Sequence, residues 1–472
     1  MKNLLIASLL AGLAVVSAGP AAGAARPNFL FVYTDDQRYD ALGVVQREQG
    51  EQARFPWFQT PNLDRLAAEG VRFRNAFVTL SLCSPSRATF LTGRYNHLNG
   101  IANNFTPFPL TNVTWATELR QAGYQTAYIG KWHMDGQRGQ RPGFDYSASF
   151  IGHARYLDAP FEINGAETAT KGWVDDVSTD YAINFIRGAK SKPWAVAVGY
   201  KSPHGPTEPP ARWADTFAGS EARPVPNLGK LPPFYAELRR GSASPATNKP
   251  SARVRLNLDY FRCLAAADEN LGRLLAALDE LKLAENTVVI YTSDNGYYHG
   301  EHGLGDKRSA YEESLRVPLL VRYPLLGASG KAMNEMVLNI DLAPTLLDFA
   351  GVPVPDQMQG RSWRPLLEGK PTAWRRSFFF EYFWEQQKNN STPSLTGVRT
   401  EAAKLIKYKD HEDWTELFDL ARDPYEITNL YRDSAAAKLR VEMESEYDRQ
   451  KQAVGFVWPA YASDPKKFSG AK

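Results

Sequence analysis

Continuous apolar segments recur along the chain, and most of them lead into clusters of polar residues. Residues 28–34 read NFLFVYT and are followed directly by Asp35 and Asp36. Similar apolar runs occupy residues 125–130, 194–200, 287–293 and 317–323. A strand that is apolar at every position is buried on both faces, as in parallel sheets covered by helices. The pattern therefore predicts several buried strands of one sheet.

Helix-like segments lie between these runs. Residues 61–70 begin with proline and end with glycine, residues 254–283 form a long amphipathic stretch, and residues 341–350 are followed by glycine. Proline in the first turn and glycine just past the last turn are typical of helix boundaries. The alternation favours an α/β fold with a central, mostly parallel sheet flanked by helices.

The pattern changes after about residue 365. Residues 377–383 and 404–408 look like short strands, and residues 435–454 form a polar helical stretch. We interpret this part as a smaller α+β subdomain with an antiparallel sheet. A further stretch, residues 203–250, is rich in proline, alanine and charge, which predicts a long irregular insertion near the functional site.

We expect three parts in the chain, and the first is a leader. Lys2 precedes an apolar run, and Ala22-Gly23-Ala24 forms an A-x-A cleavage site, which is typical of a secretory signal peptide. The run is shorter than the ~20 residues of a membrane span, although an uncleaved anchor is the alternative. We expect a periplasmic or secreted protein without a membrane span. The expected parts are residues 1–24 (signal peptide), 25–365 (catalytic domain) and 366–472 (C-terminal subdomain).

Charge and cysteine content narrow the possible functions. The chain has 55 basic and 52 acidic residues among 472, so its net charge of +3 does not indicate nucleic-acid binding. The only cysteines are Cys83 and Cys263. In an exported protein, the simplest interpretation of two cysteines is a single disulfide between them. Cys263, however, lies in a helical pattern that favours a buried core thiol.

Oxygen ligands follow two of the predicted strands. Asp35 and Asp36 end the first apolar run, and Asp294 and Asn295 end another. A single such carboxylate often only caps a turn. Two pairs from separate strands of one sheet instead favour a metal site, and a set made only of oxygen ligands suits Ca²⁺ or Mg²⁺ rather than zinc.

Cationic and proton-transfer groups accompany these ligands. Two histidines stand directly after strands, although a lone histidine there is more often a loop residue. A metal together with lysine and arginine suits a tetrahedral oxyanion such as sulfate or phosphate, because the charge on its oxygens must be neutralised. The candidate residues are Arg87, Lys131, His133, His204 and Lys307.

The segment from Cys83 to Arg94, CSPSRATFLTGR, matches a known family signature. It resembles the C-x-P-S-R and L-T-G-R signature of the type I, formylglycine-dependent sulfatases of the alkaline-phosphatase-like superfamily. The resemblance extends in order over almost the whole mature chain. Further matching segments are GKWH (130–133), SPH (202–204), SDNG (293–296), GEHGLGDK (300–307), YEESLRVP (311–318) and ELFDLARDPYEITNL (416–430).

The resemblance implies a cofactor and a mechanism. Cys83 would be oxidised to formylglycine (3-oxoalanine) by a maturation enzyme during export. One Ca²⁺ per chain would be bound by Asp35, Asp36, Asp294, Asn295 and the modified Cys83. A thiol is a poor nucleophile for a sulfate ester, because the thiosulfate product would not release easily. A hydrated aldehyde offers one hydroxyl to attack sulfur and a second that lets the intermediate collapse and expel sulfate.

The same resemblance assigns roles to the cationic and proton-transfer residues. Arg87 would fix the aldehyde hydrate, and His133 would be its base. His204 would be the acid that protonates the departing alcohol. The residues expected to neutralise or contact the sulfate group are Arg87, Lys131, His204 and Lys307.

The nature of the sulfated substrate rests on less specific segments. Residues 296–303 (GYYHGEHG) and 141–145 (RPGFD) resemble the branch that acts on sulfated amino sugars such as N-acetylglucosamine-6-sulfate, whereas residues 380–384 depart from it. The expected partner is therefore a sulfated carbohydrate. Three residues are candidate sugar contacts, with packing behind the site or a surface loop as the alternative: His302, Trp384 and Arg399.

Two other functions compete with this interpretation. A formylglycine-dependent phosphonate or phosphodiester hydrolase shares the C-x-P-x-R motif. Zinc-dependent phosphatases of the same superfamily are disfavoured, because histidine ligands are missing at the strand ends. A protein that binds sulfated glycans without turnover is also disfavoured, since every expected catalytic position is filled.

Overall fold

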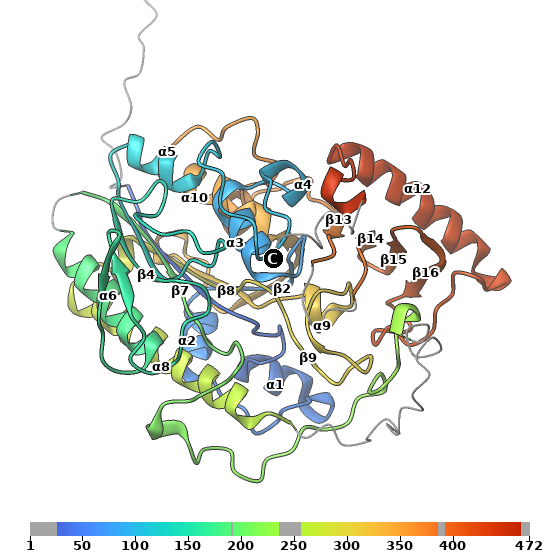
Figure 1. The fold of residues 1–472 in the computed structure, drawn as a ribbon, viewed down its shortest axis with the longest axis horizontal. Coiled ribbons are helices and arrows are strands. Elements are labelled where there is room, and N and C mark those ends of the chain that lie inside the picture. Colours follow the sequence, from blue (N-terminus) through green and yellow to red (C-terminus); the bar gives the residue numbers. More distant parts are fainter. Residues whose placement is uncertain (1–25, 190–191, 236–255, 386–391, 464–472) are drawn as a thin grey trace, which may run out of the picture.

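The computed structural model describes residues 26–189, 192–235, 256–385 and 392–463. The predicted signal peptide (1–24) lies outside these residues, as does part of the predicted insertion (203–250). Figure 1 shows a large sheet covered by helices and, beside it, a smaller sheet with one long helix. This arrangement confirms the predicted α/β class and the antiparallel C-terminal sheet.

The large sheet has ten strands in the order β12-β2-β11-β8-β1-β7-β3-β4-β5-β6. The strands β8, β1, β7, β3 and β4 run parallel, whereas β11 pairs antiparallel with both β8 and β2. Their bounds are β1 (Asn28–Thr34), β2 (Val71–Phe77), β3 (Gln125–Lys131), β4 (Tyr146–Phe150), β5 (Phe161–Ile163), β6 (Ala166–Thr168), β7 (Trp194–Gly199), β8 (Thr287–Ser293), β11 (Leu319–Arg322) and β12 (Lys331–Leu338).

Alternate residues of each central strand enter two different cores. Phe29 and Phe31 of β1 face one core, and Leu30 and Val32 face the other. Helices cover both faces of the sheet, which explains why its central strands, such as β1 and β8, are buried along their whole length (Figure 1). The first core is covered by α3 (Cys83–Thr92), α5 (Trp115–Gln121) and α10 (Leu342–Ala350), and the second by α2 (Pro61–Glu69), α6 (Val174–Gly188) and α8 (Leu258–Glu280).

The smaller sheet is an antiparallel meander near the C-terminus. Its strands are β13 (Ser377–Tyr382), β14 (Leu395–Thr400), β15 (Ala403–Tyr408) and β16 (His411–Asp419), and helix α12 (Ala437–Ala453) packs against the first three. Phe378 and Phe380 join the first core, so the two sheets share apolar packing. The shorter elements are α1 (Gly43–Gln49), α4 (Asn96–Asn99), α9 (Glu312–Leu315), α11 (Arg364–Leu367), β9 (Tyr298–His299) and β10 (Gly305–Asp306).

The two cysteines are separate, which contradicts a disulfide. Both thiols are free and buried. Cys263 lies in α8 within the second core, as its helical pattern predicted. Among the described helices, none combines the length and the apolar character that crossing a bilayer would require.

Strand β1 lies in the middle of the large sheet, where the order of the strands changes direction. It lies between β7 and β8 and is parallel to both. Open α/β sheets bind ligands at such a switch point, beyond the carboxyl ends of the strands. The residues that follow β1, β7 and β8 therefore converge on one crevice, beside the end of β3.

Gly130 lets β3 approach β7 just before Lys131. Its φ is +86°, and a Cβ atom there would lie 2.1 Å from the carbonyl oxygen of Gly199. Gly130→Ala should therefore lower the free energy of unfolding by about 3 kcal/mol. Urea unfolding measures the loss. Gly136→Ala is the matched control: an added Cβ meets nothing within 4 Å, so stability should change by less than about 0.5 kcal/mol. Equal stability of both variants would contradict the close approach.

Candidate active site

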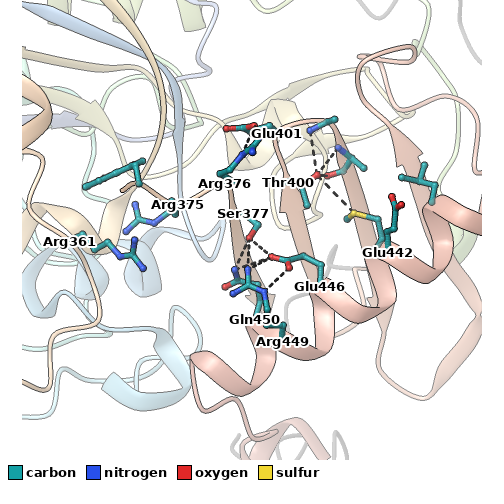
Figure 2. A pocket seen from close by; sticks show the side chains of 15 residues that line it. Arg361, Arg375, Arg376, Ser377, Thr400, Glu401, Glu442, Glu446, Arg449 and Gln450 are labelled. Carbon is teal, nitrogen blue, oxygen red and sulfur yellow. Dashed lines mark hydrogen bonds and ion pairs between the residues drawn. The ribbon is translucent and has the colours of Figure 1, made fainter. Parts of the chain in front are cut away.

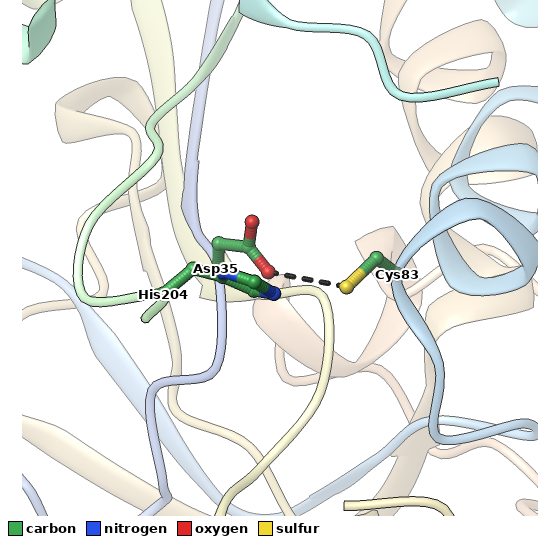
Figure 3. Close-up of side chains that lie close together, drawn as sticks. All are labelled: Asp35, Cys83 and His204. Atoms are coloured by element: carbon green, nitrogen blue, oxygen red, sulfur yellow. Dashed lines mark hydrogen bonds between the residues drawn. The ribbon is translucent and has the colours of Figure 1, made fainter. Parts of the chain in front are cut away.

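Cys83 is the first residue of helix α3, and every residue of that helix is buried. Its Sγ donates a hydrogen bond to Asp35 Oδ1 at 3.3 Å, and the ring of His204 lies beside the same carboxylate (Figure 3). Burial raises the pKa of the Cys83 thiol far above its usual range, and the charge of Asp35 adds to the effect. The unmodified side chain is therefore a neutral thiol, held at the positive end of a helix.

Carboxylates from two neighbouring strands meet next to this thiol. Oxygens of Asp35, Asp36 and Asp294 all lie within 4.8 Å of one another. The Asn295 amide nitrogen donates to Asp36 Oδ1 at 2.6 Å. Asn295 Oδ1 has no hydrogen-bond partner among the described residues, although Asn295 is 0% exposed. An unpartnered buried oxygen beside three carboxylates fits the preference of a hard divalent cation.

Burial and neighbouring charges shift the pKa values of these carboxylates in different directions. Burial raises the pKa of Asp294 to about 7, and the neighbouring Asp35 acts in the same direction. Burial also opposes the charge of Asp35, but Lys131, His204 and Arg87 outweigh it and hold the Asp35 pKa well below its usual range. A bound divalent cation would favour the ionised form of both groups.

Three cationic side chains reach the same carboxylates. Lys131, the last residue of β3, forms an ion pair with Asp35. Lys307 Nζ lies 2.5 Å from Asp36 Oδ1, and Arg87 Nη2 lies 2.7 Å from Asp294 Oδ2. Arg87 sits one turn after Cys83 on α3, so the helix places both side chains on the same side. The site therefore carries the positive charge that a bound oxyanion needs.

His204 and His133 lie at the carboxyl ends of β7 and β3. The Nδ1 of His204 donates to the carbonyl of Gly205 at 2.6 Å, and its Nε2 lies 3.8 Å from Asp36 Oδ2. His133 is buried, and its Nδ1 has no partner among the described residues. Burial and the charge of Lys131 lower the pKa of both rings. Before substrate binds, both rings are therefore neutral.

A third histidine lies between these two rings and was missed by the sequence analysis. His153 has ring centroids 4.1 Å from His133 and 4.2 Å from His204, and its Nδ1 lies 3.0 Å from Lys131 Nζ. It follows β4, a short strand parallel to β3. The sequence YSASF of β4 alternates small polar and apolar residues, so it did not stand out as a buried strand. The available signal was a histidine shortly after this strand, as at the ends of β3 and β7.

Comparison with known proteins decides the family of this site. Residues 27–352, well over half of the chain, match the family described as Sulfatase. Residues 300–453 match a second family, described as N-sulphoglucosamine sulphohydrolase, C-terminal. This chain belongs to the sulfatase family. The resemblance inferred from the motif at Cys83 is thereby confirmed, and the protein is an enzyme of the sulfatase class.

Relatives of this sulfatase are similar over nearly the full length. An N-acetylglucosamine-6-O-sulfatase of Bacteroides thetaiotaomicron is 33% identical, with 90% of this chain and 87% of the relative covered. The human N-acetylglucosamine-6-sulfatase is 28% identical, with 87% and 82% covered. A solved structure in complex with its substrate, D-glucosamine-2-N,6-O-disulfate, has a TM-score of 0.80 and 31% identity, with 91% of this chain and 98% of that chain covered.

The three candidate sugar contacts of the sulfatase lie in different surroundings. His302 is buried, with its ring stacked on Tyr311 at 3.8 Å. Arg399 is also buried and pairs with Glu312 at 3.2 Å. Trp384 is half-buried. The first two belong to a packed group of charged and aromatic side chains, and direct contact of any of the three with sugar stays a prediction.

A cavity of about 650 Å³ lies elsewhere in the sulfatase, between α12 and the first strands of the small sheet. Figure 2 shows ion pairs among its charged side chains. Arg376 bonds to Glu401, and Arg449 bonds to Glu446. None of the predicted site residues lines this cavity. The chemistry-bearing groups gather instead at the carboxyl edge of the large sheet.

Proposed function

We propose that this sulfatase removes the 6-sulfate from N-acetylglucosamine-type residues of sulfated glycan fragments, with a formylglycine derived from Cys83. Sulfate-ester hydrolysis of glycans follows from the family and its glucosamine-sulfate relatives. The observation that carries the finer proposal is the position of Cys83, which faces Asp35 within the carboxylate cluster. The most similar sequence and structure described above both concern 6-sulfated glucosamines.

The state of the thiol supports modification of Cys83. Its raised pKa leaves it protonated at neutral pH, and a neutral thiol is a weak nucleophile. A formylglycine at this position would supply a hydrated aldehyde, whose oxygen is the nucleophile toward sulfur. The charges of Lys307 and Lys131 act on the Cys83 side chain, so they are close enough to influence the reacting group.

The metal that fits the oxygen ligands is Ca²⁺. Asp35, Asp36, Asp294 and Asn295 would hold it, together with the modified Cys83. Its positive charge would stabilise the ionised nucleophile and the sulfate oxygens when bound. Asp36 has two tasks in this arrangement, because its Oδ1 also accepts hydrogen bonds from Lys307 and Asn295.

The chain's own cationic and proton-transfer groups complete the proposed site. Lys131 and Lys307 would bind the sulfate oxygens, and Arg87, bonded to Asp294, would keep the carboxylate cluster next to Cys83. His204 Nδ1 donates to the Gly205 carbonyl, so its Nε2 is the nitrogen left to face the departing alcohol. To act as the acid, the ring would first take up a proton at Nε2, which the negative charge of a bound sulfate ester would favour, and would then give that proton to the alcohol. His133 would take the proton from the nucleophile.

Export and maturation belong to the same proposal. The support is the leader-like pattern of residues 1–24 and the C-x-P-S-R motif at Cys83. We propose that the leader is removed, that the enzyme acts in the periplasm or outside the cell, and that a formylglycine-generating enzyme oxidises Cys83.

A screen of defined sulfated monosaccharides, with free sulfate as the readout, tests the function. N-Acetylglucosamine-6-sulfate should be hydrolysed in preference to its 3-sulfate isomer and to galactose-6-sulfate. The peptide that contains Cys83 should be about 18 Da lighter than the unmodified thiol form. Cys83→Ala is the inactive control, and Cys263→Ala should retain activity.

Two results of this screen would contradict the proposal. A phosphonate or phosphodiester turned over faster than every sulfated sugar would favour the alternative hydrolase function. Full activity in protein whose Cys83 remains an alkylatable thiol would exclude the formylglycine mechanism.

A further inference from the structure

His153 occupies a position that the roles assigned above do not explain. Phe150, the last residue of β4, is the register partner of Lys131 on β3. Because the two strands are parallel, the chain that follows β4 stays at the same edge of the sheet, and it brings His153 back beside the Lys131 side chain. Its half-buried ring lies between the rings of His133 and His204.

The contact with Lys131 fixes which nitrogen of His153 carries a proton. An ammonium group has three N–H donors and no acceptor. Lys131 Nζ uses one donor in its ion pair with Asp35 and lies 3.0 Å from His153 Nδ1. Nδ1 must therefore be the acceptor, so the proton of the neutral ring is on Nε2. The surroundings agree, because burial and the charge of Lys131 lower the pKa of His153.

We propose that His153 is a positioning residue that orients the Lys131 ammonium toward the bound sulfate group. With two donors held by Asp35 and His153, the third N–H of Lys131 has one remaining direction, away from both. A lysine side chain otherwise has several rotatable bonds, and fixing its head in advance favours binding of an anion. The inference rests on the proposed function only in naming sulfate as that anion.

Substitutions at His153 can separate this role from direct contact with the sugar. Asparagine places its Oδ1 where the histidine has Nδ1, so His153→Asn keeps an acceptor for Lys131 and loses the Nε2–H group. Glutamine extends its amide to the position of Nε2, so His153→Gln keeps a donor there and loses the Nδ1 acceptor. His153→Ala removes both.

We expect His153→Ala to lower kcat/KM for nitrophenyl sulfate and for a sulfated sugar by the same factor, about 10- to 100-fold, which is the range for a lost hydrogen bond to a charged group. His153→Asn should recover most of the loss, and His153→Gln should remain as impaired as His153→Ala. Product inhibition by inorganic sulfate should weaken in the same order. His411→Asn, far along the chain on β16 and stacked on Trp414, is the matched control and should change nothing.

A second measurement does not need turnover. In protein labelled with ¹⁵N-histidine, long-range ¹H–¹⁵N correlations distinguish the two neutral tautomers of each of the seven histidines. The signal that disappears in His153→Asn should be a neutral ring with its proton on Nε2. If the wild type hydrolyses no sulfate ester, the proposed function fails, while this spectrum still tests the contact with Lys131.

Several outcomes would overturn the inference. One is an imidazolium or an Nδ1–H tautomer at His153. Equal losses for His153→Ala and His153→Asn would show that the acceptor is not what matters. A loss confined to the sugar substrate would show that His153 contacts the sugar instead.

Discussion

Asp294→Asn should leave a folded chain that releases sulfate about a thousandfold more slowly than the wild type, or worse. The substitution preserves the shape of the side chain and removes its charge. Asp294 Oδ2 accepts a hydrogen bond from Arg87 Nε at 2.8 Å, and its Oδ1 accepts one from the Asp36 backbone at 3.2 Å. It also belongs to the cluster that would hold the metal. A metal contributes several kcal/mol to transition-state stabilisation, which corresponds to a thousandfold or more in rate.

Elemental analysis and thermal unfolding identify the cause of that loss. Wild-type protein should contain about one Ca²⁺ per chain, and added Ca²⁺ should raise its Tm, because a ligand that binds only the native state stabilises it. Asp294→Asn should lose both properties. Asp341→Asn removes another buried carboxylate that pairs with an arginine, Arg375, and should lower the Tm but keep the metal and the activity. Stoichiometric zinc without calcium in active protein would refute the oxygen-ligand site.

His204→Ala should reduce the turnover of a sulfated sugar about a hundredfold more than that of nitrophenyl sulfate. Nitrophenolate is a good leaving group that needs little protonation, whereas a sugar alkoxide is strongly basic and needs an acid. His204 Nε2 is the nitrogen available for this task once the ring is protonated, because Nδ1 donates to Gly205. His133→Ala should impair both substrates about equally, since both reactions share one nucleophile.

Steady-state kinetics of both variants on both substrates measures these ratios. If His204 only supports the loop after β7, His204→Ala should reduce turnover of the two substrates equally and modestly and should lower the Tm. That result would remove His204 from the acid role. A His133 variant impaired only on the sugar would exchange the two assignments.

The sequence predicted the part of this site that lies at the ends of long apolar strands. Asp35 and Asp294 follow β1 and β8, whose seven residues are all buried, so their pattern was unmistakable. The bounds of β1 and β8 were predicted without error. Lys131 and His204 were found in the same way, because β3 and β7 are also nearly continuous apolar runs.

Other parts depended on contacts that a local pattern does not contain. His153 follows a five-residue strand with alternating character, and only its parallel pairing with β3 brings it to Lys131. The antiparallel direction of β11 between β8 and β2 also results from tertiary pairing. Arg399 was predicted as a candidate sugar contact, with packing behind the site or a surface loop as the alternative, and its pairing with Glu312 allows it to be buried.

The burial of helix α3 has a consequence for the order of events during biosynthesis. All ten of its residues are buried, and Cys83 itself is 0% exposed. An oxidising enzyme cannot reach this thiol once the chain has folded, so the proposed oxidation has to occur on the newly made, extended chain. The fraction of active molecules would then depend on the rate of oxidation relative to the rate of folding. If the proposed modification is required, a chain that folds before oxidation would stay inactive, and slower folding would increase the yield of active enzyme.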